Sequence, residues 1–350
     1  MAIINVSNSA QLASALSAAR GGETIYLANG SYGDLTISQN YASNITIKAA
    51  DDLNARFDVL KITGSNVTVD GVSISGRLSI QGANDVGVVN SFSSTWNEVK
   101  FSSNVIIADN EFTNTLSIEE STGFQVTGNY IHEVAGDLMR VVGNSSDGVI
   151  ENNVLWDMIP KSFPDGTYIH ADALQMFSTS RGTPHDVVIR GNYIYDDAST
   201  GDPGTLGQAI FLGGPTGGYR NIVIEENLVS TSSAHGISFY IGPEGNIIRN
   251  NTLLGSGQIN VNGGDSSGVQ IYGNVAKNID ARDGAVVGDN YIYESESDVF
   301  QIGNGATWEG FLPKAGSGVD FGSGYGALGR LTELTTGTPN PTPTPQPEPT

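Results

Sequence analysis

The chain has 350 residues, a formal net charge of −21 at pH 7, 45 glycines and no cysteine. This composition excludes disulfides and thiolate metal sites, and it disfavours nucleic-acid binding, because a phosphate backbone requires a basic surface. No apolar run approaches the roughly 18 residues of a membrane span. The N-terminal segment 1–11 lacks the basic region and cleavage site of a signal peptide, so secretion would need a signal outside this sequence.

The first predicted element is a short amphipathic helix within residues 7–22, with Leu12 and Leu16 on its apolar side. A helix here would cover one end of a repetitive β-structure, which otherwise exposes its core and its unpaired strand edges. Short alternating segments follow, such as NITIKAA at 44–50 and VTVDGVSISG at 67–76. They predict a series of strands that are separated by turns.

The middle of the chain repeats one phrase: an apolar residue, two further residues, an asparagine and the start of a new β-type run. The asparagines are Asn110, Asn129, Asn153, Asn192, Asn227, Asn251, Asn274 and, in a weaker copy, Asn290. A recurring strand–turn–strand unit predicts a solenoid of stacked β-coils. Asparagine suits its turns because it tolerates left-handed backbone conformations, and because stacked amides can hydrogen-bond to one another.

Two intervals between successive asparagines exceed the roughly 20–25 residues that one coil requires. The additional residues fall at 156–171 and 196–207. Insertions in a solenoid map to loops on one face, which is often the binding face. A loop without a function would show the same additional residues, so both a binding loop and a loop without a function remain possible interpretations.

The glycine-rich segment at about 293–336 is expected to form a C-terminal cap with packed aromatic residues at Trp308, Phe311 and Phe321. The β-helix module would then span residues 1–336. Residues 337–350 alternate proline with threonine and glutamine, which predicts an extended linker to a further domain. An acidic, cysteine-free module with such a linker is typical of a secreted protein, and we expect it to be monomeric.

This pattern resembles the right-handed parallel β-helix proteins, which include pectate lyases, alginate and chondroitin lyases, alginate epimerases, polygalacturonases and phage depolymerases. The segments 7–37 and 44–50 are similar to the start of the chondroitinase B and alginate lyase family, and the likeness in coil pattern covers about residues 1–295. It implies an all-β fold, a single right-handed parallel β-helix of about ten coils with an N-terminal helical cap. The Asp-Pro-His motif of alginate epimerases and the paired-Asp and Gly-His-Gly signatures of polygalacturonases are absent.

Aligning the strands after the long turns predicts two rows of residues on one outer face, because side chains alternate along a strand. The first row contains Arg140, Gln175, Phe211 and Ser238, and the second contains Asp137, Asp172, Gln208 and His235. Such a groove suits a sugar chain, with substrate contacts expected from Arg140, Gln175, Phe177, Phe211, His235 and Tyr240. A surface row of ordinary solvated residues is the alternative.

Basic residues are scarce, and several of them surround the first insertion: Arg140, Lys161, His170, Arg181, His185 and Arg190. A cationic cluster in so acidic a protein would attract a polyanionic glycan. Proton abstraction beside a carboxylate requires a base, a group that withdraws charge and an acid for the leaving oxygen. The catalytic candidates are Lys161, Tyr168, His170 and Arg181. The resemblance implies a lysine base and an arginine acid about one coil apart, roles that would fall on Lys161 and Arg181.

Acidic residues offer a competing kind of site, because Ca²⁺ prefers several oxygen ligands. The candidate ligands are Asp137, Asp172 and Asp202. The sequence therefore predicts a secreted polysaccharide lyase that cleaves an acidic, uronic-acid-containing polysaccharide by β-elimination, with Ca²⁺ as the candidate cofactor. A glycoside hydrolase with two carboxylates, a uronate C5-epimerase and a non-catalytic glycan-binding or adhesin module are the alternatives, because one fold hosts many functions.

Overall fold

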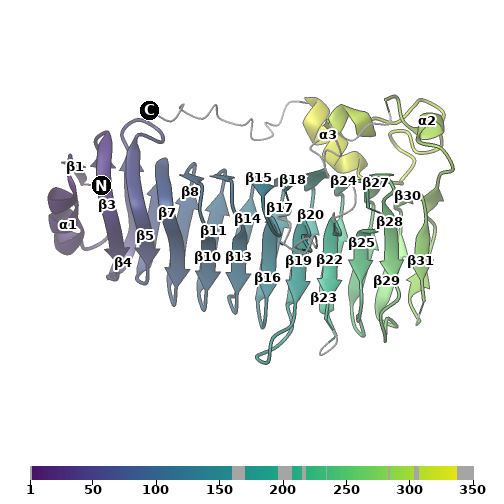
Figure 1. Ribbon diagram of the computed structural model, residues 1–350, viewed down its shortest axis with the longest axis horizontal. Helices are drawn as coiled ribbons and strands as arrows, with labels where there is room; N and C mark the ends of the chain where they lie inside the picture. Colours follow the sequence, from purple (N-terminus) through teal and green to yellow (C-terminus); the bar gives the residue numbers. More distant parts are fainter. Residues whose placement is uncertain are drawn as a thin grey trace, which may run out of the picture.

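The computed structural model describes residues 2–159, 170–195, 207–214, 218–233, 235–282, 284–302 and 307–336. In this part of the chain, short strands stack coil upon coil into an elongated right-handed parallel β-helix (Figure 1). The expected fold class is therefore confirmed. No helix among the described residues has the length and apolar character that crossing a membrane requires.

Three parallel ladders form the walls of the solenoid. Wall A contains thirteen strands: β1 (Ile3–Val6), β2 (Thr24–Leu27), β4 (Asn40–Ala49), β6 (Ser65–Asp70), β8 (Asn84–Val89), β11 (Ser103–Ala108), β14 (Gln125–Thr127), β17 (Ser146–Glu151), β20 (His185–Arg190), β23 (Arg220–Glu225), β26 (Asn246–Arg249), β29 (Val269–Tyr272) and β32 (Val286–Val287).

Wall B, whose strands run side by side across Figure 1, contains β3 (Gly30–Ile37), β5 (Ala55–Ile62), β7 (Val72–Gln81), β10 (Asn97–Lys100), β13 (Leu116–Glu119), β16 (Met139–Val142), β19 (Leu174–Phe177), β22 (Ile210–Gly213), β25 (His235–Phe239), β28 (Gln258–Val261) and β31 (Ile279–Ala281). Wall C contains β9 (Phe92–Ser93), β12 (Glu111–Phe112), β15 (Tyr130–Val134), β18 (Val154–Met158), β21 (Tyr193–Tyr195), β24 (Leu228–Thr231), β27 (Thr252–Gly255), β30 (Val275–Ala276) and β33 (Tyr291–Ile292). The long strand β7 pairs with both β10 and β9, so walls B and C diverge from it.

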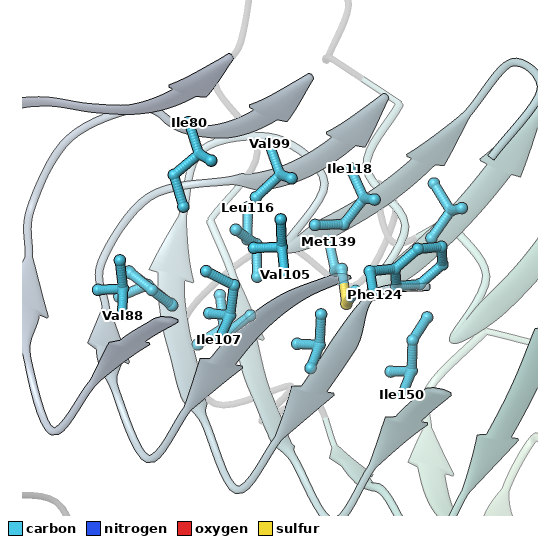
Figure 2. Close-up of a cluster of buried hydrophobic side chains, with 14 of the residues drawn as sticks. Ile80, Val88, Val99, Val105, Ile107, Leu116, Ile118, Phe124, Met139 and Ile150 are labelled. Atoms are coloured by element: carbon cyan, nitrogen blue, oxygen red, sulfur yellow. The ribbon is translucent and has the colours of Figure 1, made fainter. Parts of the chain in front are cut away.

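The core is a set of apolar stacks inside the three walls. Ile80, Val99 and Ile118 follow one another along wall B, and Val88 and Ile107 stack on wall A (Figure 2). All of these side chains are buried. Because each coil repeats the contacts of the previous coil, a short run of alternating residues suffices to extend the core.

The predicted asparagine ladder is continuous. Each side-chain Nδ2 donates to the Oδ1 of the next asparagine at 2.9–3.0 Å, from Asn110 to Asn290. The left-handed backbone that we expected at the asparagines lies one residue earlier, as at Asp109 (φ 55°) and Gly191 (φ 63°). The asparagines thus supply the amide contacts, and the residue before each of them makes the turn.

The N-terminal end is closed as the sequence predicts. Helix α1 (Ser9–Ala18) begins after Asn8, whose side-chain oxygen accepts a hydrogen bond from the Gln11 backbone N–H at 2.9 Å. An asparagine in this position satisfies a donor that the first helical turn leaves unpaired. Leu12 and Leu16 are buried against the first coils, so the apolar side of the helix is confirmed.

The C-terminal segment contains α2 (Glu296–Val299), the 3₁₀-helix η2 (Trp308–Phe311) and α3 (Leu328–Thr336). It folds back along the outer face of wall C, where Phe311 is buried and Trp308 is partly buried against Tyr193 and its neighbours. Phe321 is 52% exposed, so the expectation that it packs is wrong. Figure 1 shows α3, in yellow, beside the strands of the middle coils rather than beyond the last coil.

Candidate active site

Wall B carries the predicted outward row. The pairing of its strands places Arg140 beside Gln175, Gln175 beside Phe211, and Phe211 beside Ser238. The first three side chains are half-buried and border the solvent, but Ser238 is 4% exposed. The expected row is therefore present, with the correction that Ser238 lies buried, beneath the larger neighbouring side chains.

The acidic residues of the second predicted row do not face the solvent. Asp137 and Asp172 are both buried. One oxygen of Asp137 accepts from the Asp172 backbone N–H at 2.8 Å, and the other accepts from Arg140 Nε at 2.6 Å. Asp172 in turn accepts from the Gln208 backbone N–H at 2.6 Å and from Gln175 Nε2 at 2.9 Å. The two carboxylates hold Arg140 and Gln175 in position from below.

The pKa of Asp172 is raised to about 6, chiefly because the carboxyl group is buried and in smaller part because the Asp137 carboxylate is near. The hydrogen bond from Gln208, the proximity of His170 and the hydrogen bond from Gln175 lower the pKa in part. The net rise means that folding favours the protonated form of this carboxyl group. A group with this behaviour beside an exposed imidazole is a candidate for a functional role.

This raised pKa predicts how Asp172→Asn changes stability with pH. The folded pKa of about 6 lies above the ordinary value of 3.8, so the protonated carboxyl stabilises the fold at low pH, and this contribution is lost as the pH rises through about 6. Asparagine cannot ionise. The free energy of unfolding of Asp172→Asn should therefore increase relative to the wild type between about pH 4 and pH 7, then stay level.

Urea unfolding at several pH values measures this difference. The same pair of proteins in a His170→Ala background removes any contribution from the neighbouring imidazole. The raised pKa would be ruled out if the difference in the free energy of unfolding between Asp172→Asn and its parent protein stayed constant over the whole pH range in both backgrounds.

His170 lies at the N-terminal edge of β19, and its side chain is 57% exposed. Its Nδ1 is 3.4 Å from Asp172 Oδ2, and its Nε2 is 3.4 Å from the Gln208 amide nitrogen. These neighbours favour the tautomer with the proton on Nδ1, because the carboxylate accepts and the amide donates. The Nε2 lone pair then faces only this long contact with the Gln208 amide, and it can take a proton from a ligand that displaces the amide.

Aromatic rings continue the surface from His170. The Phe211 ring lies 6.1 Å from the His170 ring and 5.6 Å from the Tyr240 ring, both in edge-to-face arrangements. A side chain at Gly213 would collide with Phe211, because its Cβ would lie 2.3 Å from the phenyl ring. Glycine there leaves room for the Phe211 ring. Exposed ring surface of this kind suits the apolar face of a sugar.

Trp96 is a further member of this site. Its ring lies 5.6 Å from the Arg140 guanidinium carbon, although Arg140 belongs to a coil two strands away. The indole and the Asp137 carboxylate together fix the guanidinium group. Within the described part of the chain, only Nε of Arg140 has a hydrogen-bond partner, so its terminal nitrogens remain for a ligand. No periodicity marks Trp96, and only its place just before β10 distinguishes it.

The structure separates several of the residues that the sequence grouped together. His170 and Arg181 lie beyond opposite ends of β19, so these two catalytic candidates do not meet. His185 and Arg190 belong to β20 of wall A, so their inclusion in a cationic cluster with Arg140 is wrong. The remaining candidates Lys161, Tyr168 and Asp202 lie outside the described residues, as does most of both insertions.

The other predicted substrate contacts are on wall B. Phe177 is half-buried at the end of β19, and Tyr240 is 41% exposed just after β25. His235 is exposed at the start of β25, and its Nδ1 is 3.0 Å from Asn260 Nδ2. His235 and Tyr240 extend this surface from the Arg140 row toward the C-terminal coils, and Phe177 lies beside the row itself.

The described residues do not fit the expected calcium site. Among them, no three carboxylate or imidazole groups are placed to hold a metal ion together. Asp137 and Asp172 direct their oxygens to N–H donors of the protein, which are groups that would compete with a cation. We therefore assign no catalytic step to a metal.

Neither a protein-family model nor a curated protein matches this chain. Solved structures do match. An alginate lyase from Paenibacillus sp. str. FPU-7 has 16% identity and a TM-score of 0.54, over 83% of this chain and 98% of that one. A PL6 alginate lyase in complex with a trisaccharide has 12% identity and a TM-score of 0.55, over 92% and 93%. The likeness establishes the fold.

The resemblance to parallel β-helix proteins that was read from the sequence is thus confirmed. The same comparison also finds the Streptococcus pneumoniae surface protein and adhesin PfbA, with 13% identity and a TM-score of 0.55, over 82% of this chain and 92% of that one. Enzymes that cleave alginate and a surface adhesin share this backbone. The side chains of wall B, and not the backbone, must therefore carry any argument about function.

Proposed function

We propose that this protein is a secreted polysaccharide lyase that cleaves an acidic, uronic-acid-containing polysaccharide by β-elimination. The observation that carries the proposal is the arrangement on wall B, where the free end of Arg140, the exposed imidazole of His170 and the Phe211 ring lie on one outer face. A cation held in place within a protein of net charge −21 is what a carboxylated sugar requires.

The chemistry assigns a part to each group. A base removes the proton from the carbon beside the uronate carboxylate, the C–O bond to the neighbouring sugar breaks, and a carbon–carbon double bond forms in the ring that carries the carboxylate. The terminal nitrogens of Arg140 and the second amide hydrogen of Gln175 stabilise the charge that develops on the carboxylate. His170, oriented by Asp172, takes the proton at Nε2.

The leaving oxygen also requires a proton. Lys161 and Tyr168, which lie outside the described residues, remain the proposed sources of it, since both belong to the insertion that precedes His170. The monomeric state and a further domain after the 337–350 linker likewise remain predictions from the sequence.

The first test is a panel of alginate, polygalacturonate and glycosaminoglycans incubated with the purified protein. We expect ultraviolet absorbance from unsaturated uronate ends on at least one acidic polymer, with matching unsaturated oligosaccharides in the mass spectrum. New reducing ends without that absorbance would indicate a hydrolase, and a changed uronate composition without new ends would indicate an epimerase. Binding without any product would favour the adhesin alternative, for which PfbA is the structural precedent.

A further inference from the structure

Phe101 occupies a turn at the edge of wall B that disfavours its side chain. Its φ is 51°, and the ring is 40% exposed. Backbone hydrogen bonds place Gly82, Glu120 and Gly143 at the same turn in neighbouring coils, also with positive φ. A residue with a Cβ is strained in this conformation, and glycine avoids that strain. Folding alone therefore gives no reason for an exposed phenylalanine here, and such strain is typical of functional positions.

Two cations lie over the Phe101 ring. The guanidinium carbon of Arg181 is 4.7 Å from the ring centroid, and Lys100 Nζ is 5.5 Å from it. Lys100 forms an ion pair with Glu119 at 2.7 Å. Arg181 is exposed and has no ion-pair partner in the part of the chain that the structure describes. Its charge is therefore available to an anionic ligand.

A tight turn presents Arg181 at this place. Thr179 and Gly182 exchange two backbone hydrogen bonds, at 2.9 and 3.2 Å, with Arg181 between them. The Thr179 hydroxyl donates to Glu120 Oε1 at 2.9 Å, which fastens the turn to an earlier coil. Arg181 thereby reaches back from the coil of β19 to the coil of β10.

The cluster lies on the same face as the candidate active site. Lys100, Glu119 and Phe177 occupy one row across wall B, through the pairing of β10, β13, β16 and β19. Three strand spacings separate β10 from β19, which is about 14 Å along the solenoid axis. A glycan chain that passes from the Phe211 ring across wall B toward the N-terminal coils would reach the Phe101 ring.

We propose that Lys100, Phe101 and Arg181 form a second binding position, the Phe101 subsite, for a uronate residue remote from the bond that is cleaved. The uronate carboxylate binds the Arg181 guanidinium, and the carbon–hydrogen face of the sugar packs on the exposed part of the Phe101 ring. The choice of ligand rests on the proposed function, whereas the subsite itself rests on the strain, exposure and charge of these three residues.

Phe101→Gly separates a binding role from a structural one. If Phe101 served the fold, its loss would lower the melting temperature. If it serves a ligand, glycine relieves the left-handed backbone, so the melting temperature should stay level or rise while binding weakens. Arg181→Gln removes the charge from an exposed side chain and keeps the fold. Phe321→Ala, which removes another exposed phenylalanine on the C-terminal segment, is the matched control.

Affinity electrophoresis through gels that contain alginate, polygalacturonate or neutral dextran measures binding without turnover. We expect an acidic polymer to retard the wild type and Phe321→Ala equally, and Phe101→Gly and Arg181→Gln to bind it about tenfold more weakly, a loss of about 1.4 kcal/mol. Dextran should retard none of them. Unchanged retardation of both variants, or a wild type that no acidic gel retards, would overturn the subsite.

The outcomes also separate the two proposals. If retardation depends on Phe101 and Arg181 but no unsaturated product forms, the subsite is supported and the lyase activity is ruled out. If the variants form unsaturated product and bind as tightly as the wild type, the lyase activity is supported and the subsite is ruled out. For an active enzyme, the subsite predicts a higher KM of Arg181→Gln on polymer with little change in kcat, because the remote contact contributes binding rather than chemistry. The acid role that the resemblance implies for Arg181 would instead lower kcat.

Discussion

Replacing Asn192 with alanine is expected to lower the free energy of unfolding by about 2–6 kcal/mol. The Asn192 Oδ1 accepts from both the backbone and the side chain of Asn153, and its Nδ2 donates to Ile150 O and to Asn227 Oδ1. All of these contacts are buried, so water cannot replace the lost amide. Each buried group left without a partner costs about 1–3 kcal/mol, and at least two are left here.

Asn290→Ala is the matched control for this prediction. Asn290 closes the same ladder, with Oδ1 accepting from Asn274, but it is only partly buried. Water can take over its contacts, so we expect a loss of about 1 kcal/mol. Urea unfolding followed by circular dichroism measures both variants. Equal losses at the middle and at the end of the ladder would show that burial does not decide how much each amide stabilises the solenoid.

His170→Ala is expected to lower turnover of the acidic polysaccharide by about 10²–10⁴-fold, the usual contribution of a positioned proton-transfer group. The melting temperature should stay within a few degrees of the wild-type value, because the imidazole is largely exposed and its contacts with Asp172 and Gln208 are long. Initial rates from the absorbance of unsaturated ends, read beside a thermal melt of each variant, measure the two effects.

His185→Ala controls for the loss of a histidine. His185 lies on wall A, where its Nδ1 contacts the Asp186 carboxylate at 2.5 Å, and activity should survive its replacement. Lys161→Ala and Tyr168→Phe extend the series to the insertion, with the same expectation of lost turnover and retained folding. Full activity of His170→Ala would move the base elsewhere on wall B, and His235 would then be the next candidate.

Local regularities were readable from the sequence because they repeat. The asparagine ladder follows from one residue at a recurring position, and the capping helix follows from Asn8, Leu12 and Leu16 within about three turns of chain. The row of Arg140, Gln175 and Phe211 could also be predicted from the sequence, because side chains alternate along a strand and the turns mark where each strand ends. In each case neighbours in the chain decide the structure.

Contacts between coils were decided by the tertiary structure alone. One coil crosses all three walls within roughly 20 residues, so Arg190 lies on wall A although Arg181, nine positions earlier, reaches wall B. The pairs Trp96 with Arg140 and Phe101 with Arg181 depend on how far a side chain or a turn extends across neighbouring strands. The spacing of residues in the sequence does not predict these contacts. Which side chains meet depends on the number of residues in each intervening loop, and this number varies from coil to coil.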